Sequence, residues 1–271
     1  MTKFFNLTAP EIAGLLGSPP ANVQQNWPGV YAACAANGLT DCPTVIAVVA
    51  TIGTEVSAFA PINEFGGTAY FTRMYEGRKE LGNTQPGDGA RFHGRGFIQL
   101  TGRANYAQYG KALGIPLEDD PDLALKADVA TDILAQYFKD RGLPALARKG
   151  DWEGVRRGVN GHLNGWDRFS GLVGVLQKAA DARGDTLIEG VLSPDVTRLK
   201  ALLTTWGLSH ALPQPLASTP SFGPATTAAV KAFQKANGIQ PTGKVGDPTW
   251  QALQSAAALI KRKPKPKPNA N

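Results

Sequence analysis

The chain has 271 residues, of which 42% are hydrophobic and 18% are charged, a composition typical of globular proteins with one large domain or two ordinary ones. No run of the sequence approaches the roughly 18 consecutive apolar residues of a membrane span, and the N-terminal MTKFFNLTAP lacks the basic-then-apolar order of a secretory signal. These features exclude an integral membrane protein, and they predict synthesis in the cytoplasm with any export done by another component.

The net charge of +6 is unevenly distributed along the chain. Residues 1–185 contain 18 Lys and Arg against 19 Asp and Glu, whereas residues 186–271 contain 10 against 3. The positive excess therefore indicates an anionic partner for the C-terminal part and not for the rest.

The cysteines and histidines indicate neither a metal site nor a cofactor. Cys34 and Cys42 have a separation that fits no common metal site, so we expect free thiols. His93, His162 and His210 are scattered, without the short spacing of metal ligands.

Helical patterns dominate the N-terminal part of the chain. Thr8 begins a first helix through a capping box, and a second is expected over about residues 22–37, interrupted at Pro28. Residues 44–57 are apolar on almost all sides, as in a buried helix. Glu55 ends the apolar stripe of that helix, and burial penalises the charged form of a carboxylate. This is the setting that a general acid needs.

A Gly-, Pro- and Asn-rich stretch follows the buried helix, with only short strand-like pieces such as TAYFT, residues 68–72. This composition predicts an excursion that forms a cleft, and it carries Glu64 and Glu76. Glu76 is a candidate auxiliary catalytic carboxylate. An ion pair with Arg73 or Arg78 that shapes the loop is an equally good interpretation of this residue.

The remaining helices of this part are expected to begin at Asp120-Pro121, at Asp151 as a cap, and at about Asp167, the last one ending near Arg183. Between the last two, the segment VNGHLNGWDR is rich in Asn and Gly and is expected to face the cleft. The whole region, residues 1–185, is predicted to be mainly α-helical with a small β element.

Residues 186–260 are predicted to form a separate module of three short helices, joined by a Pro-rich loop. The tail KRKPKPKPNAN, residues 261–271, cannot bury a core and is expected to be disordered and extended by proline.

The stretch RFHGRGFIQLTGRANY, residues 91–106, combines glycines, arginines and amides. Glycine permits close backbone approach, and Arg, Gln and Asn supply hydrogen-bond donors. The pattern suits a wall against a hydroxyl-rich or carboxylate-bearing ligand, although a glycine-rich connecting loop fits the composition equally well.

Glu55 and Glu64 lie nine residues apart, one at the end of a buried helix and one in a polar loop. Two carboxylates in surroundings of different polarity are the equipment for glycosidic hydrolysis, in which one protonates the leaving oxygen and the other activates water or attacks the sugar. Two ordinary surface charges are the alternative.

The segment from Tyr75 to Tyr106, with GRGFIQLTGRANY preceded by YEGRKELGNTQPGDG, resembles glycoside hydrolase family 19. This family contains chitinases and the lysozyme-like endolysins of bacteriophages, and the resemblance covers roughly residues 40–180. It implies a lysozyme-like fold, with Glu55 as general acid, Glu64 as general base and Thr101 helping to hold the attacking water.

The same resemblance implies sugar contacts and a stereochemical course. Gln99 and Asn105 match sugar-contacting positions, and Asn160 matches a cleft asparagine; Arg95, Tyr106 and Arg168 are further candidates for substrate binding. The family inverts the anomeric centre, which requires carboxyls about 6.5–9.5 Å apart.

The sequence departs from the family pattern beside the acid. Members usually carry His-Glu followed by Gly-Gly, whereas here Thr54-Glu55 is followed by Val56-Ser57. The tuning of the acid or its sugar contacts must therefore differ.

Residues 190–258 resemble the three-helix peptidoglycan-binding domain of bacterial wall hydrolases. The FGP, FQ and TW elements of its pattern are present, and Phe222, Phe233, Gln234 and Trp250 are the candidate wall-binding residues. Most of the pattern consists of core and turn positions, so it identifies the fold better than the contacts.

The Lys/Pro tail lacks interleaved aromatic residues and follows no groove-reading motif, so no nucleic acid is expected. A tether to anionic wall polymers or lipid headgroups and a solubilising role both remain open.

Together these features predict a monomeric, two-domain endolysin of muramidase type that is made in the host cytoplasm and acts at the bacterial cell wall. It would cleave β-1,4 bonds of peptidoglycan for host lysis, the family leaning towards cleavage after MurNAc, and a separate holin-type membrane partner is implied. A chitinase and a non-catalytic wall-binding virion protein are the alternatives.

Overall fold

The computed structural model describes residues 4–262, with side chains up to residue 259. The chain forms two compact units, one of residues 9–179 and one that combines residues 180–271 with residues 1–8. Each unit is described by itself.

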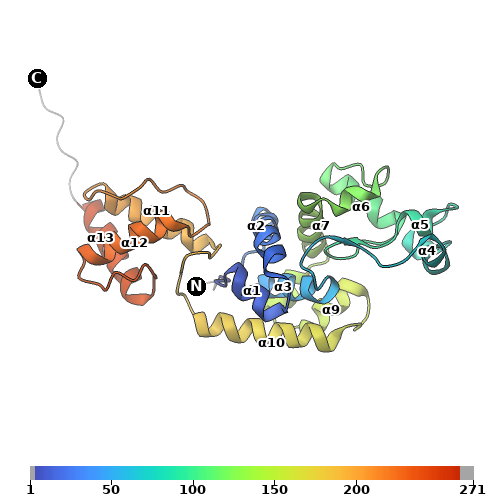
Figure 1. The fold of residues 1–271 in the computed structure, drawn as a ribbon, viewed down its shortest axis with the longest axis horizontal. Helices are drawn as coiled ribbons and strands as arrows, with labels where there is room; N and C mark the ends of the chain where they lie inside the picture. The colour runs from blue at the N-terminus through green and yellow to red at the C-terminus, as the bar shows by residue number, and fades with distance from the viewer. Residues whose placement is uncertain (1–3, 263–271) are drawn as a thin grey trace, which may run out of the picture. The chain divides into compact units, whose positions relative to one another are not determined.

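The first unit is built from helices and one small sheet (Figure 1). Its helices are α1 (Ala9–Leu16), α2 (Pro20–Ala36), α3 (Cys42–Glu55), α4 (Thr68–Tyr75), α5 (Asp88–Arg91), α6 (Arg103–Leu113), α7 (Ala127–Asp140), α8 (Leu143–Arg148), α9 (Trp152–Asn160) and the start of α10 (Trp166–Arg183). Two 3₁₀ helices, η1 (Lys79–Leu81) and η2 (Pro121–Leu125), lie between them. The strands β1 (Ile62–Asn63) and β2 (Arg95–Gly96) pair antiparallel, with Ile62 opposite Gly96.

Helix α3 is the centre of this unit, and its prediction as a buried helix is confirmed. Every residue from Thr44 to Gly53 is buried, because the segment is apolar on nearly all sides and packs against α8 and α9. Asp41 caps the helix by accepting a hydrogen bond from the backbone N–H of Thr44. The helix therefore carries Glu55 from the core to the edge of the unit.

A lobe of the first unit, residues 58–102, contains β1, β2, α4 and α5 (Figure 1). The expectation of a strand-like TAYFT piece is wrong, because these residues form α4, whose single buried residue is Phe71. The ring of Phe71 stacks on His93 with centroids 4.2 Å apart. Packing across the lobe has thus overridden the strand propensity of the aromatic and β-branched residues.

Two other helix boundaries differ from the sequence prediction. Helix α2 runs through Pro28 without a break; the buried Trp27 and Val30 beside it anchor the helix to the core on both sides of the proline. The helix expected from Pro121 is instead η2 followed by α7, because Lys126 adopts an extended conformation with ψ 132° between them.

The second unit contains three helices, as predicted: the described residues form α11 (Pro194–Gly207), α12 (Pro224–Ala236) and α13 (Asp247–Arg262). Its buried cluster unites all three helices with the segments between them, and it includes Leu187, Val196, Leu199, Leu203, Trp206, Phe222, Val230, Phe233, Val245 and Leu253. Helix α13 extends two residues into the predicted tail, and residues 263–271 of that tail lie outside the described part.

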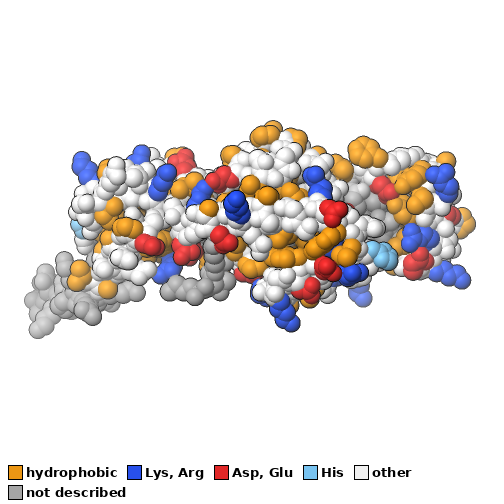
Figure 2. Space-filling model, turned by 90° about the horizontal axis from the view of Figure 1, so that it is seen from below, with side chains coloured by type: hydrophobic (Ala, Val, Ile, Leu, Met, Phe, Trp, Pro, Cys, Tyr) orange, Lys and Arg blue, Asp and Glu red, His pale blue; other side chains and the backbone are white. Residues whose placement is uncertain are grey.

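No helix in residues 4–262 is long and apolar enough to cross a membrane. On the face drawn in Figure 2, acidic and basic side chains are interspersed among apolar ones, so that face carries no single-sign surface. Cys34 and Cys42 are free and buried, as expected.

Candidate active site

Glu55 is held by an ion pair at the C-terminal end of α3. Its Oε1 accepts a hydrogen bond from Nη1 of Arg156 on α9, and the exposed fractions of the two side chains are 18% and 4%. Oε2 has no hydrogen-bond partner among residues 4–259. The surroundings are therefore not the purely apolar ones that the sequence pattern suggested, because a buried guanidinium stands beside the carboxylate.

Arg156 is itself fixed by the loop that follows α9. Its Nε donates to the carbonyl oxygen of Asn164 at 2.6 Å, and the amide of Asn160 donates to the same carbonyl at 3.1 Å. Oδ1 of Asn160 in turn accepts from the backbone N–H of His162. Asn160, predicted to contact substrate in the cleft, thus uses both ends of its amide to shape the loop that holds Arg156.

Arg168 and Thr54 lie next to the same helix end. The exposed Arg168 donates from Nε to the carbonyl oxygen of Gly53 at 2.8 Å, so this cation caps the C-terminal end of α3. The hydroxyl of Thr54, which stands where the family carries histidine, donates to the carbonyl of Ala50 at 2.7 Å. Arg156 is then the charged group that contacts Glu55.

Glu64 is held in a different way, by two donors that carry no charge. The hydroxyl of Tyr75 donates to its Oε1 at 2.6 Å, and the backbone N–H of Gly94 donates to its Oε2 at 3.0 Å. Its own backbone N–H donates to the carbonyl of Gly94 at 2.8 Å. Both carboxylate oxygens act as acceptors, which is the bonding pattern of an ionised carboxylate.

The close approach at Gly94 brings Glu64 and Gln99 together. A Cβ atom at Gly94 would lie 2.9 Å from Oε1 of Gln99 and 3.0 Å from Oε2 of Glu64, so only glycine fits there. Gln99 has a left-handed backbone with φ 52°, and its amide nitrogen donates to the carbonyls of Ile62 and Gly96. The Oε1 atom of Gln99 therefore faces the same small space as the carboxylate.

Thr101 and Asn105 follow Gln99 on the chain, and each donates a hydrogen bond to a backbone carbonyl before it. The hydroxyl of Thr101 donates to the carbonyl of Gln99 at 2.8 Å, and the amide of Asn105 donates to the carbonyl of Thr101 at 2.7 Å. Both residues are half-buried. The hydroxyl oxygen of Thr101 keeps its acceptor capacity, which a water molecule can use.

Arg95 and Tyr106, predicted to bind substrate, lie in the interior of the unit. Tyr106 is 0% exposed and Arg95 is 6% exposed. Arg95 donates to the hydroxyl of Tyr106 and pairs with Asp122, while the hydroxyl of Tyr106 donates to the carbonyl of His93. These two buried side chains support the turn between β2 and α6 from the interior.

Glu76 makes neither of the ion pairs considered for it. Its Oε1 and Oε2 accept hydrogen bonds from the backbone N–H groups of Gly87 and Gly89, at 2.6 and 2.7 Å. Arg78 pairs instead with Glu80. Glu76 therefore closes the loop that precedes α5, and it has no free carboxylate oxygen for an auxiliary catalytic role.

Arg156 and Tyr75 are the contacts of the two carboxylates that the sequence predictions omitted. Arg156 could have been found, because it lies four residues after Trp152 and three before Val159, on one helical face, and a buried arginine requires an anionic partner. The partnership of Tyr75 with Glu64 has no such local signal, since it depends on how α4 docks on the lobe.

The arrangement suits proton transfer rather than metal chemistry. Within the described part of the chain, no group of three or more His, Cys, Asp or Glu side chains could hold a metal ion. It contains instead one carboxylate paired with a buried cation and a second one held by neutral donors, which is a common way to give two carboxyl groups different tasks.

In the second unit, three of the four candidate wall-binding residues belong to the core. Phe222, Phe233 and Gln234 are at most 1% exposed, and Gln234 bonds to Gly243, Lys244 and Thr249 through its amide. The side chains of these three residues therefore contribute to the packing of the module. Trp250 is half-buried, with the guanidinium of Arg198 5.4 Å from its ring centroid.

Comparison with known proteins gives matches for both units. Residues 193–253 match a family model described as a peptidoglycan binding domain. A glycosyl hydrolase family 19 domain-containing protein of Haemophilus influenzae is 39% identical over 95 residues, which are 35% of this chain and 46% of that protein. An endochitinase of Arabidopsis thaliana is 32% identical over 107 residues, 38% of this chain and 37% of the plant protein. The matched stretch thus spans less than half of either relative.

Among solved structures, chitinase C from Streptomyces griseus matches 64% of this chain and 94% of its own length, with a TM-score of 0.51 and 20% identity. At this identity the likeness is one of fold. The predicted fold class, a mainly helical lysozyme-like domain followed by a helical peptidoglycan-binding module, is confirmed. The chain therefore shares a stretch of sequence with a family 19 domain-containing protein and a fold with a chitinase.

Proposed function

We propose that the protein is a peptidoglycan hydrolase that cleaves β-1,4 glycosidic bonds, with Glu55 as general acid and Glu64 as general base. The observation that carries this proposal is the contrast between the two carboxylates. Both carboxylate oxygens of Glu64 accept a hydrogen bond, one from Tyr75 and one from Gly94. Glu55 stands at the end of an apolar helix, and one of its carboxylate oxygens has no hydrogen-bond partner among residues 4–259. The match of residues 193–253 to a peptidoglycan binding domain supports the wall glycan as substrate.

In the proposed reaction, Glu55 donates its proton to the leaving glycosidic oxygen from the unpaired Oε2. Glu64 accepts a proton from a water molecule that attacks the anomeric carbon from the opposite face, and Thr101 holds that water through its hydroxyl. The glycosidic bond breaks with its electron pair on the protonated oxygen, and the new bond to water inverts the configuration.

Further parts of the proposal concern biological context. We propose an endolysin of bacteriophage type, monomeric and made in the host cytoplasm, that reaches the wall through a separate holin-type membrane partner and cuts after MurNAc. Residues 1–185 would be the catalytic domain, residues 186–260 the wall-binding module and residues 261–271 an electrostatic tether. In this module Trp250 is the proposed wall contact.

The first experiment is digestion of purified peptidoglycan, followed by turbidity and by mass spectrometry of the reducing ends. The wild-type protein should clear the suspension and release MurNAc reducing ends. Glu55→Gln and Glu64→Gln should each lower the rate by about 10³-fold, the usual worth of a positioned acid or base. Glu153→Gln is the matched control, because Glu153 is a carboxylate on the surface of α9, 58% exposed.

Unchanged turbidity with the wild-type protein, or clearing by Glu55→Gln at the wild-type rate, would contradict the proposal. The chitinase alternative is favoured by the Arabidopsis relative, which is described as an endochitinase. Faster release of sugars from soluble chitin oligomers than from peptidoglycan would support that alternative. Wall binding without any hydrolysis would support a non-catalytic wall-binding protein.

A further inference from the structure

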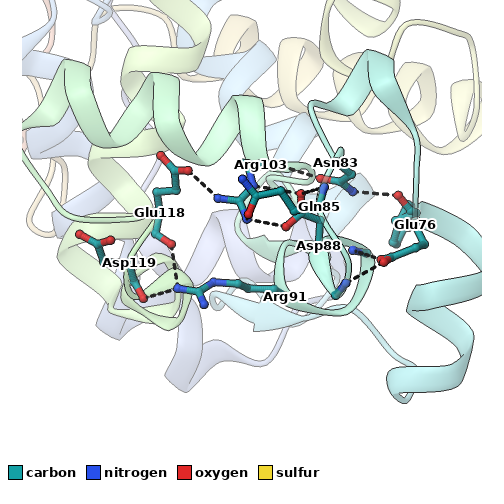
Figure 3. Close-up of polar contacts among 11 residues, drawn as sticks. Glu76, Asn83, Gln85, Asp88, Arg91, Arg103, Glu118 and Asp119 are labelled. Carbon is teal, nitrogen blue, oxygen red and sulfur yellow. Dashed lines mark hydrogen bonds and ion pairs between the residues drawn. The ribbon is translucent and has the colours of Figure 1, made fainter.

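The segment LGNTQPGDG, residues 81–89, contains a buried polar residue that no catalytic role accounts for. Asn83 is 0% exposed. Its amide nitrogen donates to the carbonyl of Tyr75 at 2.9 Å, and its amide oxygen accepts from the backbone N–H of Arg103 at 2.8 Å (Figure 3). One side chain thus joins the end of α4 to the start of α6.

Arg103 anchors the other side of this junction. Its guanidinium binds both oxygens of Asp88, at 2.5 and 3.0 Å, and also Oε1 of Glu118 at 2.7 Å (Figure 3). Asp88 is 1% exposed, and its hydrogen bonds with Arg103 are the main reason why its pKa is lowered. Paired bonds between a guanidinium and a buried carboxylate hold a fixed geometry.

A second clamp lies directly beside Tyr75. Glu76 closes the loop onto the N–H groups of Gly87 and Gly89 (Figure 3). The carbonyl of Tyr75 and the side chain of the next residue are therefore both tied to the segment that Asp88 and Arg103 lock, so the backbone at Tyr75 has little freedom.

The side chain of Tyr75 points from this fixed backbone to Glu64. Its hydroxyl donates to Oε1 of Glu64 at 2.6 Å, and its ring stacks on Phe71 with an interplanar angle of 16°. Burial first, and the hydrogen bond with Glu64 second, raise the pKa of Tyr75. The phenol consequently remains a hydrogen-bond donor over the whole range in which a glycosidase acts.

We propose that Tyr75 is a positioning residue for Glu64, and that the buried cluster of Asn83, Asp88 and Arg103 fixes Tyr75 for this task. The inference rests on the proposed function, in which Glu64 is the base. A glutamate side chain rotates about three bonds, and the hydroxyl of Tyr75 together with the N–H of Gly94 fixes both of its oxygens. A base held in advance at the position of the attacking water contributes to rate and not to substrate affinity.

The direct test is Tyr75→Phe, which keeps the ring and removes the hydroxyl. We expect kcat on soluble glycan to fall about tenfold, corresponding to the loss of one hydrogen bond to a charged group, with KM unchanged within twofold. Tyr70→Phe is the matched control, since Tyr70 is another tyrosine of α4 and also contacts Phe71.

Wild-type kcat in Tyr75→Phe, or a change in KM in place of the fall in kcat, would overturn the positioning role. A purely structural role predicts a lower melting temperature with wild-type kcat for the folded fraction, and this result would also overturn it. Activity should therefore be normalised to folded protein measured by circular dichroism at the assay temperature.

The coupling through the cluster is tested by a double-mutant cycle with Asn83→Ala and Tyr75→Phe. We expect Asn83→Ala to lower kcat about fivefold in the wild-type background and less than twofold in the Tyr75→Phe background. Equal effects in both backgrounds would contradict the coupling.

The variant Glu64→Gln tests the proposed function separately. If Glu64→Gln keeps wild-type activity, Glu64 is not the base and both proposals fail. If Glu64→Gln is inactive while Tyr75→Phe behaves as wild type, only the inference about Tyr75 fails.

Discussion

The surroundings of Glu55 and of Glu64 show two different ways to hold a carboxylate. Glu55 ends a helix whose residues from Thr44 to Gly53 are buried, and it meets one charged partner, Arg156. Glu64 stands in the lobe of residues 58–102, outside any helix, and it meets two neutral donors. In the first case apolar packing positions the side chain, and in the second a polar network does.

This difference determines what should disturb each carboxylate. A helix fixed by apolar packing is insensitive to pH, whereas a lobe held by ion pairs such as that of Asp88 and Arg103 depends on their charge state. Loss of the positive charge beside Glu55 should therefore mainly change stability, and an added side-chain atom beside Glu64 should mainly change the rate.

Arg156→Gln should have the largest effect on stability. Breaking a pair of which one side chain is 4% and the other 18% exposed should lower the free energy of unfolding by about 3 kcal/mol. Urea unfolding measures this change.

Arg157→Gln serves as the control for that variant. Arg157 lies on the same helix, but its pair with Glu153 is long, 3.7 Å, and both side chains are more than half exposed. Its replacement should change the free energy of unfolding by less than about 0.5 kcal/mol. An equal loss of unfolding free energy in the two variants would show that the contact between Arg156 and Glu55 does not contribute to stability.

Gly94→Ala should impair the Glu64 side of the site. The new Cβ would lie 3.0 Å from Oε2 of Glu64, so the carboxylate must shift slightly. We expect the rate to fall by about 30-fold, less than the cost of about 100-fold for a displacement of roughly 1 Å. The measurement is kcat/KM on soluble glycan. Gly171→Ala is the control, because nothing lies within 4 Å of a Cβ at this helical position; unaltered kcat/KM in Gly94→Ala would count against Glu64 as base.

Asp88→Asn should make the stability of the protein less sensitive to low pH. Arg103 lowers the pKa of Asp88, so the stabilisation is complete above the ordinary value of about 4 and is lost as pH falls through the lower, folded-state value. At pH 7 the variant should be about 2 kcal/mol less stable, the contribution of hydrogen bonds to a charged group. Its free energy of unfolding should then fall less steeply than that of the wild type below pH 4. Parallel curves in chemical denaturation would contradict this role of Asp88.

Trp250→Ala should leave both carboxylates undisturbed and alter only wall binding. The half-buried Trp250 is the one candidate wall-binding residue with an accessible side chain, and its loss should weaken binding to isolated walls about fivefold, or about 1 kcal/mol. Hydrolysis of soluble glycan should not change. Leu259→Ala, at an apolar side chain that is 64% exposed, is the control in the sedimentation assay.

The predictability of the two regions from sequence follows the same contrast. The buried helix and Glu55 at its end could be predicted because an all-round apolar run is a local signal. Helix α4 could not, because TAYFT favours a strand and the packing of Phe71 on His93, 22 residues away, decides the outcome.

The site residues divide in the same way. Gln99 and Thr101 could be identified from the motif and Glu64 from the wider resemblance, yet the contacts of Glu64 and Gln99 depend on the close approach at Gly94. Arg95 and Tyr106 belong to the same motif, but they face inward, and a motif does not distinguish residues that support a site from residues that line it. The bond from Asn83 to Tyr75 and Arg103 joins segments up to 20 residues apart, and only the folded lobe reveals it.

The different roles of Glu55 and Glu64 are tested most directly by NMR of the first product released from a soluble β-1,4 glycan. An acid and a base acting on opposite faces invert the anomeric carbon, so the α-anomer should accumulate first and the β-anomer should appear only at the rate of mutarotation. Early accumulation of the β-anomer would contradict the assignment of Glu64 as a base that activates water.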